Sequence, residues 1–336
     1  MVADVGSELT WHDLDEDDVR IRPNPKGSRP RTKRRPSFDN APLGMILEVH
    51  LRRYRVLTDA GNEILATLAK DLRSEGCVTG DRVALDGDTS GEKGSLARIV
   101  RVEQRSSVLT RAAEDGEELE QTIVANADQM VIVMAAANPE PRPRLVDRYL
   151  VAAINSGLRP ILVITKSDLA DPNHLANQFS DVDLTIVPTR SDKPDLNTLR
   201  AELAGHVSVF VGHSGVGKST LINMLTGEDR STGGVNELTG KGKHTSSSAV
   251  ALRFDGGWII DTPGIRSFGL SSIDAAQILR GFPDLQAVAA QCPRDCSHLA
   301  NSPDCELDDA AEENRISAAR LDSFRRLVSS VSSVDF

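Results

Sequence analysis

A run of glycines followed by a lysine and hydroxyl residues lies in the middle of the chain. Residues 212–219 read GHSGVGKS and fit the pattern G-x-x-x-x-G-K-[ST], between the apolar segment VSVFV and the apparent helix STLINMLTG. Glycine at 212 and 217 lets consecutive backbone N–H groups face phosphate oxygens, where a Cβ would block the turn or the approach. The alternative, a glycine-rich turn in a sheet protein, is disfavoured by the flanking strand and helix.

The loop therefore predicts a nucleoside triphosphate site. Lys218 would bring positive charge to the β- and γ-phosphates, and the Ser219 hydroxyl would bind Mg²⁺. The residues expected to hold the nucleotide here are Gly212, His213, Ser214, Gly215, Val216, Gly217, Lys218, Ser219 and Thr220.

Two further segments are typical of a site that senses the γ-phosphate. An apolar strand ends at Asp261 and continues as TPG, so Asp261 would hold Mg²⁺ through water and the Gly264 N–H would reach the γ-phosphate. Between this segment and the phosphate loop, residues 240–247 (GKGKHTSS) are rich in glycine and hydroxyl groups, as in a switch loop. Thr245, or failing that Ser246, would close over Mg²⁺; a plain flexible linker is the alternative.

Guanine recognition is predicted for Thr165, Lys166, Ser167 and Asp168, which end the strand ILVIT. The Asp168 carboxylate would accept hydrogen bonds from guanine N1–H and the 2-amino group, a pair of donors that adenine lacks. Lys166 would lay its methylene stem along the base. GTPases usually carry Asn-Lys-x-Asp, so Thr165 removes an amide that braces the phosphate loop, and we expect relaxed selectivity. A surface turn is the alternative interpretation of these four residues.

The order of these segments indicates a circular permutation. In an ordinary GTPase the phosphate loop comes first, whereas here residues 165–168 precede 212–219, which precede 244–246 and 261–264. One nucleotide site is rebuilt only if the chain has been permuted, which such domains tolerate because their termini lie close together. The switch region then leads directly into the C-terminal segment.

A metal site is predicted near the C-terminus from Cys292-x3-Cys296-x-His298-x6-Cys305. Three thiols and one imidazole form a closed tetrahedral set suited to a structural Zn²⁺, which leaves no open position for catalysis. Coincidental cysteines in a loop are the alternative. Cys77 stands apart and is interpreted as a small buried residue.

The surrounding elements predict a multidomain chain. From residue 122 the expected strands are 129–135, 161–165, 184–187, 206–211 and 258–261, and the expected helices are 145–156, 198–204 and 218–225. This alternation predicts an α/β domain with a mostly parallel sheet and ligands at its carboxyl edge. Short β segments between 42 and 111 predict a small barrel, of which the OB-fold is the commonest nucleic-acid-binding form. Apolar residues at helical spacing predict one helix over about 311–328.

The expected boundaries are a disordered tail at 1–40, an OB-fold domain at 41–112, a permuted P-loop GTPase domain at 113–278 and a helical zinc-binding domain at 279–336. In the tail, seven acids within 4–18 precede a basic block at 20–35; it is either a solvated tail or an arm that orders on a phosphate backbone. Barrel arginines that could line a phosphate-tracking groove are Arg52, Arg53, Arg55, Arg73, Arg98, Arg101 and Arg105. Tyr54 alone offers an aromatic platform there, which argues against a general single-strand binder.

Composition excludes several classes of protein. The 336 residues carry 39 basic and 49 acidic side chains, a net charge of −10, and 39% hydrophobic residues, which supports folded cores rather than a wholly disordered chain. No apolar run approaches the ~20 residues of a membrane helix, and the four cysteines do not form a secreted disulfide pattern. We expect a cytoplasmic monomer with no membrane partner.

Together these motifs resemble the ribosome small subunit-dependent GTPase A (RsgA, or YjeQ) family. The residues that carry the resemblance are TKSD at 165–168, GHSGVGKST at 212–220, GKGKHTS at 240–246, DTPGI at 261–265, NADQ at 126–129, the Cys₃His cluster and ISAARLDSFRRL at 316–327. The resemblance spans about 42–328 and implies an OB domain, a permuted GTPase domain and a zinc domain. It also implies GTP hydrolysis stimulated by the small (30S) ribosomal subunit and its rRNA during late maturation. The family more often has Asn at 165 and zinc spacings of x4 and x5.

The resemblance also bears on catalysis. Ile265 occupies the position where Ras-like GTPases carry a water-orienting glutamine, so hydrolysis should be slow without another group. His244 is the best candidate to position the water, His213 a lesser one, and a solvated loop histidine the alternative. Catalytic roles are therefore expected for His244, Lys218 and Thr245. A GTP-dependent RNA-binding switch without productive turnover, or a P-loop kinase or ATPase, are the competing functions.

Overall fold

The computed structural model describes residues 38–51, 53–73, 76–92, 94–111, 121–180, 182–227, 249–262 and 273–332. Residues 1–37 of the predicted tail, His244, Thr245 and Gly264 lie outside these ranges. No helix within them is long and apolar enough to cross a membrane.

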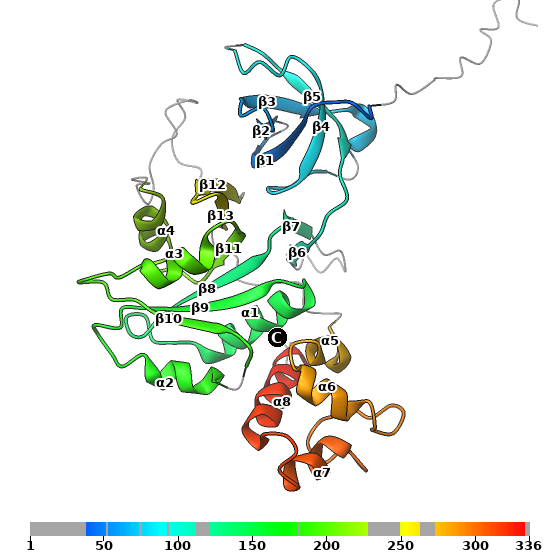
Figure 1. Cartoon of the computed structure of the whole chain (residues 1–336), viewed down its shortest axis with the longest axis vertical. Coiled ribbons are helices and arrows are strands. Elements are labelled where there is room, and N and C mark those ends of the chain that lie inside the picture. Colours follow the sequence, from blue (N-terminus) through cyan, green and yellow to red (C-terminus); the bar gives the residue numbers. More distant parts are fainter. Residues whose placement is uncertain are drawn as a thin grey trace, which may run out of the picture. The chain divides into compact units, whose positions relative to one another are not determined.

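The first unit is a closed five-stranded barrel (Figure 1). Its strands are β1 (Leu43–His50), β2 (Arg53–Thr58), β3 (Glu63–Leu68), β4 (Arg82–Gly87) and β5 (Ala97–Val102), with the 3₁₀ turn η2 (Lys70–Leu72) after β3. The strands pair in the order β1-β2-β3-β5-β4, β4 pairs back to β1, and β3 runs parallel to β5. Alternate residues such as Ile46, Val56 and Ile99 fill the interior. The predicted OB-like barrel is confirmed, and Cys77 is a buried member of its core.

Most of the barrel arginines do not line an open basic groove. Arg55, Arg98, Arg101 and Arg105 each pair with a carboxylate of the barrel, respectively Glu63, Asp86, Glu103 and Asp81. Arg53 and Arg73 have no such partner among the described residues, and Arg52 lies outside them.

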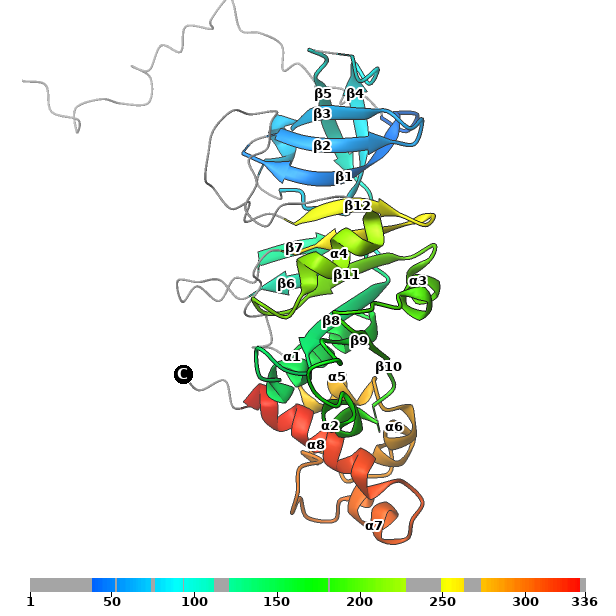
Figure 2. The same cartoon turned by 90° about the vertical axis from the view of Figure 1, so that its left-hand side faces the viewer.

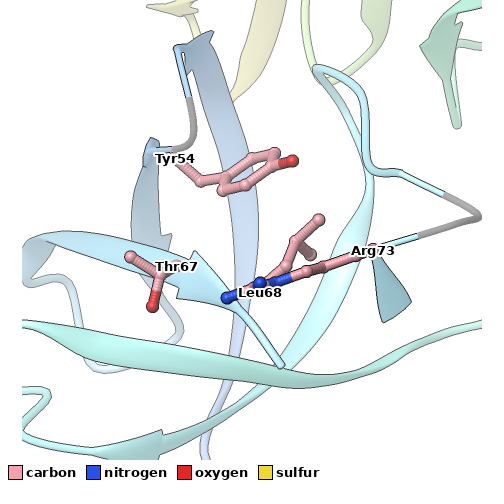
Figure 3. Close-up of a pocket in the computed structure, with 4 residues that line it drawn as sticks. All are labelled: Tyr54, Thr67, Leu68 and Arg73. Atoms are coloured by element: carbon pink, nitrogen blue, oxygen red, sulfur yellow. The ribbon is translucent and has the colours of Figure 1, made fainter. Parts of the chain in front are cut away.

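Tyr54 is not the exposed platform that the sequence predicted. Its side chain is buried, and it forms one wall of a cavity of about 560 Å³ with Thr67, Leu68 and Arg73 (Figure 3). The ring is held inside the barrel because β2 directs alternate residues inward, Tyr54 together with Val56.

A parallel sheet forms the second unit. Its order is β10 (Thr185–Pro188), β9 (Arg159–Thr165), β8 (Gln129–Ala135), β11 (Val207–Val211), β13 (Gly257–Asp261) and β12 (Val250–Phe254); the first five are parallel and β12 is antiparallel. Every residue of β8 is buried, as expected of a central strand. A single pair, Glu48 with Val250, joins β1 to β12. Beside the sheet, β6 (Val108–Arg111) and β7 (Gln121–Ala125) form a two-stranded ribbon.

Helices connect the strands of this sheet. They are α1 (Pro143–Asn155), α2 (Asn173–Ala176) with the 3₁₀ turn η3 (Asn177–Phe179), α3 (Asn197–Leu203) and α4 (Lys218–Thr226). α1 packs on β8 and β9, and α4 packs on β12 and β13. The strands and helices predicted from the sequence lie within a few residues of these bounds, so the α/β prediction is confirmed.

The C-terminal unit is helical, with α5 (Ala275–Leu279), α6 (Pro283–Ala289), α7 (Glu306–Glu312) and α8 (Ala318–Ser332) (Figure 2). α8 packs against α1 and α5, and Phe324 meets Phe282 edge to face with centroids 5.7 Å apart. The helix predicted over about 311–328 is present as α8, but the prediction was wrong about its start, because a turn separates α7 from α8. Asn314 turns the backbone to a φ of +57°, which ends α7, and the Ser317 hydroxyl accepts the Arg320 N–H at the start of α8.

Candidate nucleotide site and metal centre

The phosphate loop lies between β11 and α4, as the sequence predicted. Gly217 takes a φ of +90° at the N-terminal cap of α4, a conformation that side-chain-bearing residues rarely adopt. A Cβ on Gly212 would lie 2.6 Å from the Val133 carbonyl oxygen, so β8 leaves no room for a side chain there. The backbone N–H groups that open α4 lie at the positive end of the helix, an arrangement that favours an anion such as phosphate.

The predicted base loop lies beside the phosphate loop. The Thr165 hydroxyl donates to the Val216 carbonyl at 2.5 Å, although the two residues are 51 positions apart. Lys166 Nζ donates to the Gly215 carbonyl at 2.9 Å and also bonds the Asn138 carbonyl. The sheet explains this meeting, since β9 and β11 flank β8 and end at the same edge.

These contacts bear on the expectation about Thr165. The sequence predicted the loss of an amide that braces the phosphate loop, and the Thr165 hydroxyl bonds a carbonyl of that loop instead. The expected effect on guanine selectivity stays a prediction. The contribution of Asn138 was missed altogether, because a backbone carbonyl in a proline-rich turn carries no motif.

Asp168 follows on the same loop and is oriented by the end of β10. Its Oδ1 accepts the Ser191 N–H at 2.6 Å, and the neighbouring Ser167 N–H donates to the Thr189 carbonyl at 3.1 Å. Both partners were missed by the sequence, since backbone groups after a short strand leave no pattern. Asp168 and the phosphate loop are thus parts of one edge of the sheet.

Lys218 and Asp261 also come together. The Lys218 ammonium forms an ion pair with Asp261 Oδ1 and donates to the Thr262 carbonyl at 3.0 Å. Pairing of Phe210 with Asp261 in the β11–β13 ladder brings the two strand ends side by side. The Thr262 hydroxyl donates to the Phe210 carbonyl at 2.6 Å, which fixes the start of the segment that leads to Gly264.

The structure describes some of the remaining predicted nucleotide-site residues but not all of them. Ser219 is half-buried and Ser214 and Thr220 are exposed on the phosphate loop, where His213 Nδ1 lies 3.0 Å from the Ser214 carbonyl. His244, Thr245 and Gly264 fall outside the described residues, so their roles stay predictions.

The four predicted metal ligands converge. One donor atom from each of Cys292, Cys296, His298 and Cys305 lies within 4.8 Å of all the others. Tetrahedral zinc, with Zn–S of about 2.3 Å, needs ligand separations of about 3.5–4 Å, so a small contraction closes the set. His298 Nδ1 is buried and has no hydrogen-bond partner among the described residues, as expected of a nitrogen that faces an ion. The donor set therefore fits Zn²⁺.

The charges around this cluster are consistent with a metal site. Burial and the thiols of Cys296 and Cys292 raise the pKa of Cys305 to about 11, so an ion must displace its proton to bind. Burial, with the nearby Arg325, lowers the pKa of His298, which favours the neutral imidazole that ligates metals. Arg325 donates to the His298 carbonyl at 3.0 Å and pairs with Asp308 at 2.7 Å. It thus ties α8 to the ligand loop, a role that the sequence did not indicate.

The fold and the converging loops define a P-loop protein with a permuted nucleotide domain between a barrel and a Cys₃His unit. A family model described as RsgA GTPase matches residues 102–271. The small ribosomal subunit biogenesis GTPase RsgA of Ectopseudomonas mendocina (strain ymp) is 39% identical over 269 residues, 77% of this chain and 76% of that protein. The protein of the same name from Azotobacter vinelandii (strain DJ / ATCC BAA-1303) is 39% identical over 265 residues, 76% of this chain and 75% of that protein.

Solved structures agree. YjeQ from Thermotoga maritima superposes with a TM-score of 0.64 at 26% identity, over 87% of this chain and 99% of that one. YloQ, a circularly permuted GTPase, gives a TM-score of 0.63 at 22% identity over 88% and 96%, a likeness of fold. This chain belongs to the RsgA GTPase family and is a GTP hydrolase.

Proposed function

We propose that this GTPase acts in biogenesis of the small ribosomal subunit, where it binds the 30S particle and its rRNA and assists late maturation. Hydrolysis of GTP to GDP and phosphate is stimulated by that subunit. The relatives named above support the subunit as partner, since their names assign them to its biogenesis. The observation that carries the nucleotide assignment is the direct hydrogen bond between the base loop and the phosphate loop, Thr165 to Val216.

In this proposal the pocket divides into two halves. Asp168 accepts the guanine edge while its carboxylate is held by the Ser191 N–H. The phosphate loop and Lys218 hold the phosphates, and the Lys218–Asp261 pair separates so that Lys218 turns to the nucleotide and Asp261 to water-bound Mg²⁺. Ser219 and Thr245 are the proposed Mg²⁺ ligands, Gly264 senses the γ-phosphate, and His244 positions the attacking water.

One structural zinc completes the protein in this proposal. Cys292, Cys296, His298 and Cys305 hold it, and no position remains for a substrate. The ion would join the loops between α6 and α7, where the chain has little apolar core of its own. The protein would work as a cytoplasmic monomer.

RNA contact is proposed through local positive charge, because the chain as a whole carries a net charge of −10. No carboxylate among the described residues pairs with Arg53 or Arg73, in contrast to Arg98, which pairs with Asp86. Arg52 and the basic block at 20–35 would add to them.

Phosphate release measured with purified small subunits, large subunits and neither tests this function. We expect slow turnover alone, little change with large subunits, and strong stimulation by small subunits. Equal rates in all three mixtures would contradict the proposal and favour a switch that binds RNA without productive turnover.

A further inference from the structure

Three arginines gather where helix α1 begins. Arg142 is the residue before the helix, Arg144 lies in its first turn, and Arg148 lies one turn further along. Arg142 and Arg144 are exposed and Arg148 is half-buried. These three residues are called the α1 arginine cluster below.

The cluster forms no ion pair with a carboxylate in the part of the chain that the structure describes. Asp147, the one acid of α1, is 1% exposed and is paired with Arg326, although Arg144 acts on it at longer range. Glu140, two residues before Arg142, is exposed and is likewise unpaired among the described residues. The positive charge of the cluster is therefore not neutralised by a close contact within these residues.

The position of this charge is unfavourable for the helix itself. The N-terminal end of a helix carries a partial positive charge and favours acidic residues, yet the first turn of α1 contains none. Arg144 and Arg148 are four positions apart, and like charges at this spacing destabilise a helix. Positive charge that is costly to the fold and lacks a close partner in it indicates an anionic partner outside the chain.

The cluster also lies next to the nucleotide site. Residues 136–142 lead to α1 from β8, whose carboxyl end is at the sheet edge that carries both nucleotide loops. In this connection the Asn138 carbonyl bonds Lys166 of the base loop. A Cβ on Gly215 of the phosphate loop would lie 3.6 Å from Pro139 Cδ. A partner held by the cluster would thus be bound close in the chain to residues that contact both loops.

We propose that the α1 arginine cluster binds the phosphate backbone of RNA, as a contact surface of the nucleotide domain separate from the barrel arginines. The inference rests on the proposed function, which supplies the RNA, and adds a surface to it. Arginine suits this partner because its planar guanidinium can donate two hydrogen bonds to a phosphate and stays charged. An acidic segment of this chain is the competing occupant, and the test separates the two.

The test measures binding of the full chain to purified small subunits by sedimentation over a salt series, with a non-hydrolysable GTP analogue present. One variant replaces all three cluster arginines by Gln, and a second replaces them by Lys. The matched control loses the same charge from three exposed arginines that are paired with Asp86, Glu202 and Glu306 respectively, and it carries Arg98→Gln, Arg159→Gln and Arg315→Gln.

We expect the Gln variant to reduce the slope of log K against log salt by about 2–3, since each phosphate contact contributes about 0.7–0.9. Its affinity at physiological salt should fall on the order of 10- to 100-fold. The Lys variant should keep most of the slope, and the control should bind as the unmodified chain does. GDP affinity and turnover without subunits should not change in the Gln variant. Its melting temperature should not fall, because the like charges at the positive end of α1 are gone.

An unchanged slope in the Gln variant would overturn the inference, and this is the result expected if an acidic segment of the chain covers the cluster. An equal loss in the control would also overturn it, as would a lower melting temperature of the Gln variant, which would assign the arginines to stability. Failure of the unmodified chain to bind small subunits would instead overturn the proposed function.

Discussion

At the scale of single residues, we propose that guanine selectivity depends on Asp168. Its Oδ1 is held at 2.6 Å by the Ser191 N–H, so the carboxylate is oriented before a base is present. The Arg190 guanidinium, which precedes Ser191 in the chain, forms its ion pair with Asp192 and not with Asp168.

Replacing Asp168 by Asn should lower GTP affinity by on the order of 10³–10⁴, because the guanine donors would then face an amide. Xanthine carries a carbonyl where guanine has its 2-amino group, so the same variant should gain affinity for XTP. Competition of the two nucleotides against a labelled GDP analogue measures both effects. A variant that still prefers GTP by the original factor would show that the base lies elsewhere.

At the scale of elements, helices α8 and α1 are joined by an ion pair whose carboxylate is buried and whose guanidinium is partly exposed. Arg326 Nε lies 3.1 Å from Asp147 Oδ1, and the Asp147 side chain is 1% exposed while that of Arg326 is 37% exposed. Arg326 also stacks over Phe179, 5.1 Å from the ring centroid. Burial raises the pKa of Asp147 although Arg326 and Arg144 lower it, so removal from water outweighs the attraction of the arginines.

Breaking this pair from one side should therefore be costly. Arg326→Gln leaves a buried carboxylate without its cation and should lower the free energy of unfolding by about 2–3 kcal/mol at pH 7–8, whereas Asp147→Asn should change it by less than about 1 kcal/mol. Because the pKa of Asp147 is raised in the folded state, its contribution to stability is present below the unfolded pKa of about 4 and is lost as pH rises through the folded value. The loss of unfolding free energy caused by Arg326→Gln should thus be smaller near pH 4. Urea unfolding at pH 4 and at pH 7–8 measures this loss. An equal loss at the two pH values would show that it does not come from the unpaired Asp147 carboxylate.

The zinc unit permits a second prediction at this scale. Between α6 and α7 the described chain buries little besides Cys305, so the ion should supply the folding energy of these loops. Cys296→Ser, or a strong chelator, should remove one zinc per chain and lower the melting temperature by several degrees or more. Cys77→Ser is the matched control, since this cysteine lies in the barrel core, and should retain one zinc. Full zinc occupancy in Cys296→Ser would remove that residue from the ligand set.

The sequence predicted the features that depend on neighbouring residues and missed those that depend on contacts between distant segments. The strand at 129–135 was predicted with its true bounds because residues 130–135 are an uninterrupted apolar run, as expected of a fully buried strand. The convergence of the Cys₃His cluster was predicted because the spacing of its four residues is short. The break between α7 and α8 was missed, because the apolar spacing of Ile316, Leu321 and Phe324 begins after Asn314 and carries no sign of the turn there. Asn138 and Ser191 make their contacts through backbone groups that the sheet brings close to the base loop, and a backbone contact cannot be predicted from the type of residue.

At the scale of the whole molecule, association with RNA should depend on a few free cations rather than on net charge. Replacing Arg53 and Arg73 together by Gln should weaken binding to the small subunit and reduce the slope of log K against log salt by about 2. Arg98→Gln is the control, because this arginine is already paired with Asp86. Sedimentation with subunits over a salt series measures the slope. An unchanged slope in the double variant, or an equal change in the control, would contradict the proposed contact.

The permuted nucleotide pocket is tested most directly by a crystal structure of the chain with GDP and Mg²⁺. The predicted result has the guanine edge on Asp168 and the β-phosphate on the backbone of 212–219, with Thr165 still bonded to Val216 between them. A purine bound away from Asp168, or phosphates bound outside 212–219, would contradict the claim that residues 165–168 and 212–219 form one nucleotide pocket despite their permuted order in the chain.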